Sequence, residues 1–211
     1  MGNHGLDPRV VAYLAKVERD RIAGFDRRAE SAFALDAAGA IEGPVLDVGV
    51  GKGIFAIEVA RRGFEVVGID PDPEALDFAG ALAEHAGVSG RLRLLQADAA
   101  DLPFPDGAFG AVVSMNALHH LPDADSVLRN LARLVRFGGR VVLADLYGAG
   151  LEWIGRRHFE DHGIPHPVGP VTVQSAVAGL VALGLHAQAT LRSGWEEVAV
   201  LVRPETVTPS R

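Results

Sequence analysis

The chain alternates short apolar runs with segments of helical character, and this alternation constrains the fold more than any other feature. Five runs are typical of buried strands, and they span Val45 to Val50, Glu65 to Ile69, Arg91 to Gln96, Gly110 to Met115 and Arg140 to Leu146. The predicted helices between them span Gly53 to Arg62, Pro73 to Ala86 and Asp123 to Phe137, the last ending at a Gly138-Gly139 cap. Such alternation predicts a parallel sheet with helices on both faces.

The segments around this core have different patterns. Residues 7–35 carry apolar side chains near helical spacing and are predicted to form an N-terminal helical segment. Residues 148–170 have no sustained period, which predicts an inserted, lid-like segment or an irregular connection. A helix is then predicted over residues 171–183, followed by strands over 185–191 and 197–202 whose short turn makes them antiparallel. Residues 204–211 are expected to be a frayed tail.

Length and composition narrow the classes of protein further. A chain of 211 residues suits a single domain over residues 1–211. The net charge of -7 offers no attraction to nucleic-acid phosphates, and the sequence holds no cysteine for disulfides or zinc thiolates. No apolar run is long enough for a membrane span. We therefore expect a soluble, cytoplasmic protein, monomeric or homodimeric, that binds no nucleic acid.

The residues that point most clearly to chemistry begin at the first strand. This strand runs into a turn with glycines at positions 49, 51 and 53, where the absence of a Cβ lets a ligand approach the backbone. The second strand ends in Asp70, placed where a carboxylate can bind the two hydroxyls of a ribose. Asp98 follows the third strand at the same edge of the sheet, where open α/β folds bind their ligands.

This ordered set of motifs resembles the class I methyltransferases that use S-adenosylmethionine (SAM), in particular the small-molecule branch with the ubiquinone and menaquinone biosynthesis enzymes. The resemblance covers roughly residues 43–146, and the terminal strand pair more loosely. It implies a Rossmann-like, seven-stranded, mostly parallel sheet whose last strand is antiparallel, with helices on both faces. It also implies SAM as the cofactor and transfer of its methyl group to a small-molecule acceptor by in-line displacement.

The resemblance also implies roles for individual residues. Asp47, Gly49 and Gly51 would shape the pocket for the methionine part, Asp70 would hold the ribose, and Asp98 with the Ala99 backbone would bind the adenine. The other predicted cofactor-binding residues are Lys52, Pro71 and Asn116. Asn116 belongs to a stretch that resembles the family's fourth motif, near the transferred methyl group. Lys52 departs from the usual loop, and it either lies along the surface or points to the methionine carboxylate.

The histidines are the candidates for acid–base chemistry. His119 and His120 follow the fourth strand and are predicted as catalytic residues, because an imidazole there could accept a proton from the acceptor. The alternative is that one packs and the other caps a turn. His158 and His162 have the helical spacing of some metal sites, but Gly163 and Pro165 should end any helix before His166. No metal is therefore predicted, and a substrate-covering segment containing Trp153, Phe159 and His162 is favoured.

Two other functions share parts of this pattern. An NAD-dependent oxidoreductase has the same glycine turn and ribose-binding acid, but its fingerprint is Gly-x-Gly-x-x-Gly. Here Gly53 comes one residue early and Ile54 occupies the glycine position, which favours SAM. A non-catalytic SAM-binding domain would keep the cofactor residues without an acceptor pocket, and residues 148–170 argue mildly against it.

Overall fold

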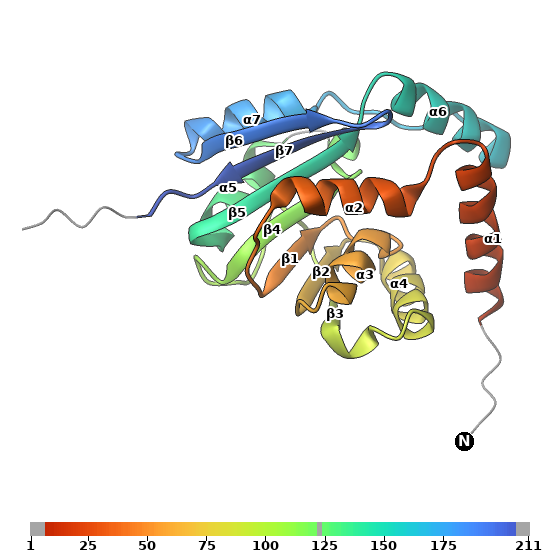
Figure 1. The fold of residues 1–211 in the computed structure, drawn as a ribbon, viewed down its shortest axis with the longest axis horizontal. Helices are drawn as coiled ribbons and strands as arrows, with labels where there is room; N and C mark the ends of the chain where they lie inside the picture. Colours follow the sequence, from red (N-terminus) through yellow and green to blue (C-terminus); the bar gives the residue numbers. More distant parts are fainter. Residues whose placement is uncertain (1–6, 122–123, 206–211) are drawn as a thin grey trace, which may run out of the picture.

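A seven-stranded sheet forms the centre of the protein in the computed structural model, which describes residues 7–121 and 124–205 (Figure 1). The strands are β1 Val45–Val48, β2 Val66–Asp70, β3 Leu92–Gln96, β4 Phe109–Met115, β5 Val135–Leu146, β6 His186–Arg192 and β7 Glu196–Val202. Their order is β3-β2-β1-β4-β5-β7-β6, and β7 runs antiparallel to both of its neighbours. The predicted fold class, with its antiparallel last strand, is confirmed.

Helices cover both faces of this sheet, as the alternation of the sequence predicts. They are α1 Pro8–Ile22, α2 Arg27–Ala38, α3 Ile54–Arg61, α4 Pro73–His85, α5 Asp125–Leu134, α6 Ala149–His162 and α7 Val173–Ala182, with short 3-10 turns at Ser89–Arg91 and Leu118–His120. Along β1, Leu46 and Val48 pack toward the core that α5 and α7 complete, whereas Val45 packs toward α2 and α3. This two-faced burial explains why the strands have nearly continuous apolar sequences.

The parallel strands bring their carboxyl ends to one edge of the sheet. β1 pairs in register with β2 on one side and with β4 on the other. Helices α1 and α6 lie beyond this edge, at the same end of the molecule (Figure 1). The segments that the sequence places outside the regular α/β alternation therefore lie next to the strand ends, where a ligand is expected. Among the described residues, no helix has the length and apolar character needed to cross a membrane.

The N-terminal helical segment consists of two helices separated by a turn. Helix α1 ends at Ile22, Gly24 has a φ of 104°, and α2 begins at Arg27. Asp26 caps α2 because its side chain accepts hydrogen bonds from the backbone N–H groups of Arg28 and Ala29. The prediction of one helical stretch over residues 7–35 is thus corrected at this turn, which buries Phe25.

Two other predictions of secondary structure were wrong. Residues 149–162 form a regular helix, α6, which ends at a left-handed Gly163, as the position of that glycine indicates. The Gly138-Gly139 pair does not cap α5, because that helix ends at Leu134 and the pair lies within β5. The register of β4 and β5 shifts between Phe109 and Ala111, and this irregularity accommodates the pair inside the strand. The predicted tail lies outside the described residues from position 206 onward.

Candidate functional site

The glycine turn between β1 and α3 is shaped by two close contacts. Gly49 has a φ of 76°, and a Cβ at this position would lie 2.5 Å from the Cβ of Ala117. A side chain is therefore excluded on both conformational and steric grounds. The N–H of Gly51 donates to Oδ2 of Asp70 at 2.8 Å, which ties the turn to the end of β2. The turn thus presents bare backbone at the strand edge.

A cavity of about 390 Å³, here called the strand-end cavity, opens on one side of this turn. Its lining includes seven of the predicted cofactor residues: Gly49, Gly51, Asp70, Pro71, Asp98, Ala99 and Asn116. Oδ1 of Asp70 accepts a hydrogen bond from the N–H of Asp72 at 3.0 Å, and Oδ1 of Asp98 accepts one from the N–H of Ala100 at 2.8 Å. Both carboxylates are therefore held in place at the cavity wall.

A second cavity of about 310 Å³, here called the helix-covered cavity, lies on the other side of the turn. Asp47 and Lys52 line it, together with Gly49, Gly51 and Asn116, which also line the strand-end cavity. The nine predicted cofactor-binding residues therefore border two cavities that meet at the glycine turn. Helices α1, α2 and α6 and the start of β7 contribute much of the remaining wall, through residues that include Tyr13, Lys16, Arg27, Glu30, Ile154, His158, His162 and Glu196.

Buried carboxyl groups give the helix-covered cavity an unusual electrostatic character. Burial raises the pKa of Asp47 to about 7, and the neighbouring Asp70 adds to this shift. Burial likewise raises the pKa of Glu196 to about 8, and it raises the pKa of Glu30. A cationic ligand in this cavity would favour the ionised forms of these groups, because an opposite charge offsets the cost of their desolvation.

Asn116 lines both cavities and lies where they meet. Its φ is 57°, a conformation that is uncommon outside glycine and is often found at functional sites. Its Nδ2 donates to Oε1 of Glu196 at 2.9 Å, while its Oδ1 accepts from the N–H of Leu146 at 3.1 Å. The side chain thus links the ends of β4, β5 and β7.

Lys52 extends from the glycine turn toward α1. Its Nζ lies 4.8 Å from the centre of the Tyr13 ring and 5.8 Å from that of Phe78. These distances allow a cation–π interaction with Tyr13. Of the two placements that the sequence leaves open, the structure shows a side chain that rests on an aromatic ring and also borders the helix-covered cavity.

The two predicted catalytic histidines differ in their surroundings. His119 is 4% exposed, and its Nδ1 lies 2.5 Å from Oδ1 of Asp145, while its Nε2 lies 3.1 Å from Nε2 of His166. His119 lines neither cavity, whereas His120 lines the strand-end cavity. Burial lowers the pKa of His166 to about 4, and it also lowers the pKa of His120, with His119 contributing to both shifts. Their catalytic role stays a prediction.

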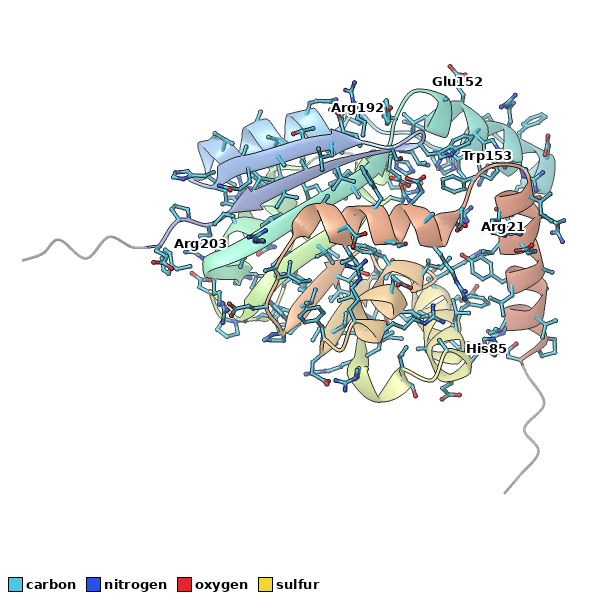
Figure 2. All side chains as sticks on the ribbon, in the orientation of Figure 1. Arg21, His85, Glu152, Trp153, Arg192 and Arg203 are labelled. Carbon is cyan, nitrogen blue, oxygen red and sulfur yellow. The ribbon has the colours of Figure 1, made fainter. Side chains whose placement is uncertain are left out.

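Helix α6 provides part of the cover that the sequence predicts, but through different side chains. Trp153 packs in the interior, 4.8 Å from Phe25 and 5.9 Å from Trp195 between ring centres. Figure 2 shows it beside the loop that joins α1 to α2. Phe159 is 58% exposed and lines neither cavity, whereas His162 lines the helix-covered cavity. Of the three predicted contacts, His162 alone faces the cavity.

Several residues of the site were missed by the sequence reasoning. Asp145 is the last residue but one of β5, close to the strand end as Asp70 is on β2, so the strand-end rule could have identified it. Glu196 is a fully buried acid at the start of an apolar strand, and this contrast could also have marked it. Glu30 and Arg27 lie on a helix with many charged residues, and nothing in the sequence distinguishes them.

Comparison with known proteins finds similarity to methyltransferases. Residues 46–143 match the sequence model of a family described as methyltransferase domain. An uncharacterised methyltransferase of Mycobacterium sp. (strain JLS) is 37% identical over 125 residues, which are 59% of this chain and 45% of that protein. The 27-O-demethylrifamycin SV methyltransferase of Amycolatopsis mediterranei (strain S699) is 39% identical over 113 residues, 51% of this chain and 42% of that protein.

A solved structure resembles the fold. Geranyl diphosphate C-methyltransferase from Streptomyces coelicolor A3(2), in complex with Mg²⁺, geranyl diphosphate and S-adenosyl-L-homocysteine, has a TM-score of 0.66 and 16% sequence identity. The similarity covers 83% of this chain and 77% of that one. The matches to the two curated relatives, by contrast, span less than half of their lengths. Residues 46–143, which the family model matches, contain the glycine turn and the carboxyl ends of β1, β2, β3 and β4.

Proposed function

We propose that this chain, whose residues 46–143 match the methyltransferase-domain family model, binds SAM and transfers its methyl group to a small-molecule acceptor. The observation that carries the proposal is the meeting of two cavities at the glycine turn, one lined by strand-end acids and one covered by helices. An adenosine group and an acceptor need separate compartments that share the reacting centre. The ubiquinone and menaquinone branch stays a prediction.

The strand-end cavity is the proposed adenosine site. Asp70 accepts hydrogen bonds from the N–H groups of Gly51 and Asp72, one on each oxygen. A carboxylate has about four lone-pair positions, so acceptor capacity remains for two ribose hydroxyls. Asp98 and Ala99 line the same cavity, and the Asp98 side chain with the Ala99 backbone would bind the adenine.

The methionine part of SAM would cross the bare backbone at Gly49 toward Asp47. SAM carries a positive sulfonium and a positive ammonium group. Asp47 and Glu196 are buried carboxyls with raised pKa values in the cavity beyond the turn, so a cation there would stabilise their ionised forms. The position of the glycine turn and the charge of these carboxyls thus support the same placement of the methionine part of SAM.

The helix-covered cavity is the proposed acceptor site. Methyl transfer from a sulfonium is an in-line displacement, so the protein must align the acceptor with the methyl group and exclude water. Helices α1, α2 and α6 provide the cover, and a cavity of about 310 Å³ suits a small molecule. The relative whose name gives a rifamycin precursor as its substrate also supports a small-molecule acceptor.

A base is required when the acceptor is a hydroxyl or a protonated amine. His158 and His162 line the acceptor cavity, and Nε2 of His158 is buried with no hydrogen-bond partner among the described residues. His119, in contrast, has both ring nitrogens close to other groups. His120 lines the strand-end cavity, the proposed adenosine site. We therefore assign proton removal to the α6 histidines in preference to His119 and His120.

Binding and transfer test this proposal separately. Calorimetry should show that S-adenosylhomocysteine binds with a dissociation constant in the micromolar range or below, while NAD gives no heat. Tight NAD binding without S-adenosylhomocysteine binding would instead indicate an oxidoreductase. Transfer is measured with labelled SAM on a panel of hydroxyl, amine, carboxylate and carbon acceptors. S-adenosylhomocysteine binding without transfer to any of them would favour the non-catalytic alternative.

The α6 histidines are tested once an acceptor has been found. Replacing both His158 and His162 by alanine should reduce transfer to a hydroxyl acceptor by about a hundredfold, in the range of general-base contributions, while cofactor affinity stays nearly constant. His186→Ala, at an exposed histidine on β6, is the matched control. Unchanged transfer in the double variant would remove the assignment of the base.

A further inference from the structure

Three histidines to which the proposed reaction assigns no role converge beside the proposed site: His120 lines the strand-end cavity, and the ring centre of His166 lies 5.0 Å from that of His158. His119 and His120 lie in the 3-10 turn after β4, and His166 lies in the segment after α6. Each offers one ring nitrogen, and these atoms all lie within 4.8 Å of one another. The Nε2 atoms of His119 and His166 are 3.1 Å apart. Two imidazoles that bind one cation at about 2.0–2.1 Å with tetrahedral geometry have nitrogens roughly 3.3 Å apart, close to this separation.

We propose that His119, His120 and His166 bind a divalent first-row transition-metal cation such as Zn²⁺. Three neutral imidazoles are the ligands of a well-known type of zinc site, whereas Mg²⁺ and Ca²⁺ prefer oxygen ligands. Sequence spacing predicted no metal, because it considered His166 with His158 and His162. The fold instead brings His166 to the turn after β4, 46 residues away along the chain from His120.

The groups around these histidines are those that hold metal-binding imidazoles in other proteins. Nδ1 of His119 lies 2.5 Å from Oδ1 of Asp145, and the backbone N–H of His119 donates to Oδ2 of the same carboxylate at 2.9 Å. The His120 side chain has a hydrogen bond to the backbone of Pro167. Metal-binding histidines commonly donate their second ring N–H to a carboxylate or a carbonyl. In His119, a proton on Nδ1 leaves the Nε2 lone pair facing His166.

The segment that carries His166 is held against this turn by the backbone. The N–H of Gly169 donates to the carbonyl of His119 at 2.5 Å, and a Cβ at Gly169 would lie 2.6 Å from the carbonyl oxygen of Leu121. This close packing fixes the two sides of the cluster without a metal. A cation would further fasten the segment after α6 to the sheet, beside the helix that lines the helix-covered cavity.

A simpler explanation for one contact is a hydrogen bond between two neutral imidazoles. It accounts for the 3.1 Å between His119 and His166 and assigns no function to His120, which the 3-10 turn places beside His119. The two explanations differ in whether the protein binds added metal. They also differ in the effect of His120→Ala, since this residue contributes nothing to a hydrogen bond between the other two.

The experiment uses the full chain after treatment with a chelator. Calorimetry with Zn²⁺ alone should show one equivalent bound, and Co²⁺ should give the visible absorption typical of low-coordinate nitrogen sites. His120→Ala and His166→Ala should each weaken Zn²⁺ binding at least about tenfold, whereas His186→Ala, at an exposed histidine elsewhere, should leave it unchanged. Zn²⁺ should raise the Tm of the unaltered chain but not that of His166→Ala.

Several results would overturn the proposal. They are the absence of stoichiometric Zn²⁺ binding, binding that survives both His120→Ala and His166→Ala, and binding that is lost only with the α6 histidines His158 and His162. Circular dichroism checks that each variant is folded, and His166→Gln replaces His166→Ala if the latter is not. S-adenosylhomocysteine binding to the metal-free chain is measured in parallel, so failure of the metal site and failure of the proposed cofactor site are distinguished.

Discussion

The two walls of the proposed active site are built in different ways. The cofactor wall consists of the glycine turn and the ends of β1, β2 and β3, and its shape depends on bare backbone at Gly49 and on fixed carboxylates. The covering wall consists of side chains from α1, α2, α6 and the start of β7. The first wall needs a backbone geometry that few residue types allow. The second needs side chains that meet only because the chain folds.

The two walls also differ in whether the methyltransferase family model matches them. The methyltransferase family match ends at residue 143 and contains the whole cofactor wall but none of α1, α2 or α6. In the proposed function the cofactor wall binds SAM, the ligand that methyltransferases of this kind would have in common. The covering wall is the proposed acceptor side, where the ligand would differ from one methyltransferase to another. Substitutions in the two walls should therefore separate fold stability, cofactor affinity and acceptor turnover.

The largest effect is expected from Trp153→Ala, which tests whether the covering wall is independent of the cofactor wall. Trp153 is 7% exposed and packs with Phe25, Leu146 and Trp195. Removing its indole should lower the free energy of unfolding by about 3 to 5 kcal/mol. Cofactor affinity should stay nearly constant at a temperature where the variant is folded, because Trp153 lines neither cavity.

Denaturant unfolding and calorimetry measure the two quantities. Phe159→Ala is the matched control, since it removes an aromatic ring from the same helix at a 58% exposed position and should change stability by less than about 0.5 kcal/mol. A large loss of cofactor affinity in folded Trp153→Ala would show that the two walls are coupled.

Glu196→Gln tests whether the buried Glu196, where the two walls meet, makes the stability of the protein depend on pH. Burial raises the pKa of Glu196 to about 8, above its ordinary value, so the folded protein keeps a proton that the unfolded chain releases. Stability should therefore be highest at low pH and should fall as pH rises toward 8, by as much as about 4 kcal/mol. Glutamine keeps an acceptor for Asn116 and cannot ionise, so the variant should lose part of this decline.

The measurement is the free energy of unfolding of the unaltered protein and of Glu196→Gln between about pH 5 and about pH 9, the range in which the Glu196 carboxyl is expected to titrate. Glu84→Gln, at an exposed position of α4, is the control for the loss of one negative charge. The same pH dependence in the unaltered protein and in Glu196→Gln would show that Glu196 does not titrate in this range.

The sequence predicts the cofactor wall well because each of its elements is encoded locally. The run from Val45 to Gly53 contains a strand, a turn and the start of a helix, and Asp70 and Asp98 follow strands that alternation identifies. Every predicted cofactor residue borders one of the two cavities. Local pattern is informative here because ligands bind at strand ends in this class of sheet, so the expected site lies where the strands end.

The covering wall was predicted poorly because its contacts join distant segments. The pattern of residues 148–170 hid α6, since Trp153 faces the interior while His158 and His162 face the cavity, which leaves no simple apolar stripe. Gly138 and Gly139 imitate a helix cap, but pairing of β5 with β4 places them in a strand. The approach of His166 to His119 depends on the whole path of the chain, which no local spacing reveals.

Gly49→Ala should disrupt the cofactor wall directly. The new Cβ would lie 2.5 Å from the Cβ of Ala117, at a φ of 76°, so the turn must move. S-adenosylhomocysteine affinity should fall about a hundredfold or more, equivalent to about 2.7 kcal/mol. Gly87→Ala is the matched control, because Gly87 has a φ of 71° and no atom within 4 Å of the added Cβ. It carries the same conformational strain without the clash, so normal cofactor affinity is expected.

The smallest effect is expected from Asp70→Ala, which tests whether the ribose is bound at the end of β2. Two hydroxyls would lose a charged acceptor in a partly desolvated site, so S-adenosylhomocysteine affinity should fall by about 1 to 3 kcal/mol. Asp70 also accepts the N–H of Gly51, so the alanine variant loosens the glycine turn as well. Asp70→Asn separates these roles, because its amide oxygen can still accept from Gly51 while the negative charge is lost. Asp101→Ala, at an exposed acid beyond the third strand, controls for charge. If calorimetry gives the same dissociation constant for folded Asp70→Ala and the unaltered chain, the ribose lies elsewhere and the cofactor wall does not bind SAM as proposed.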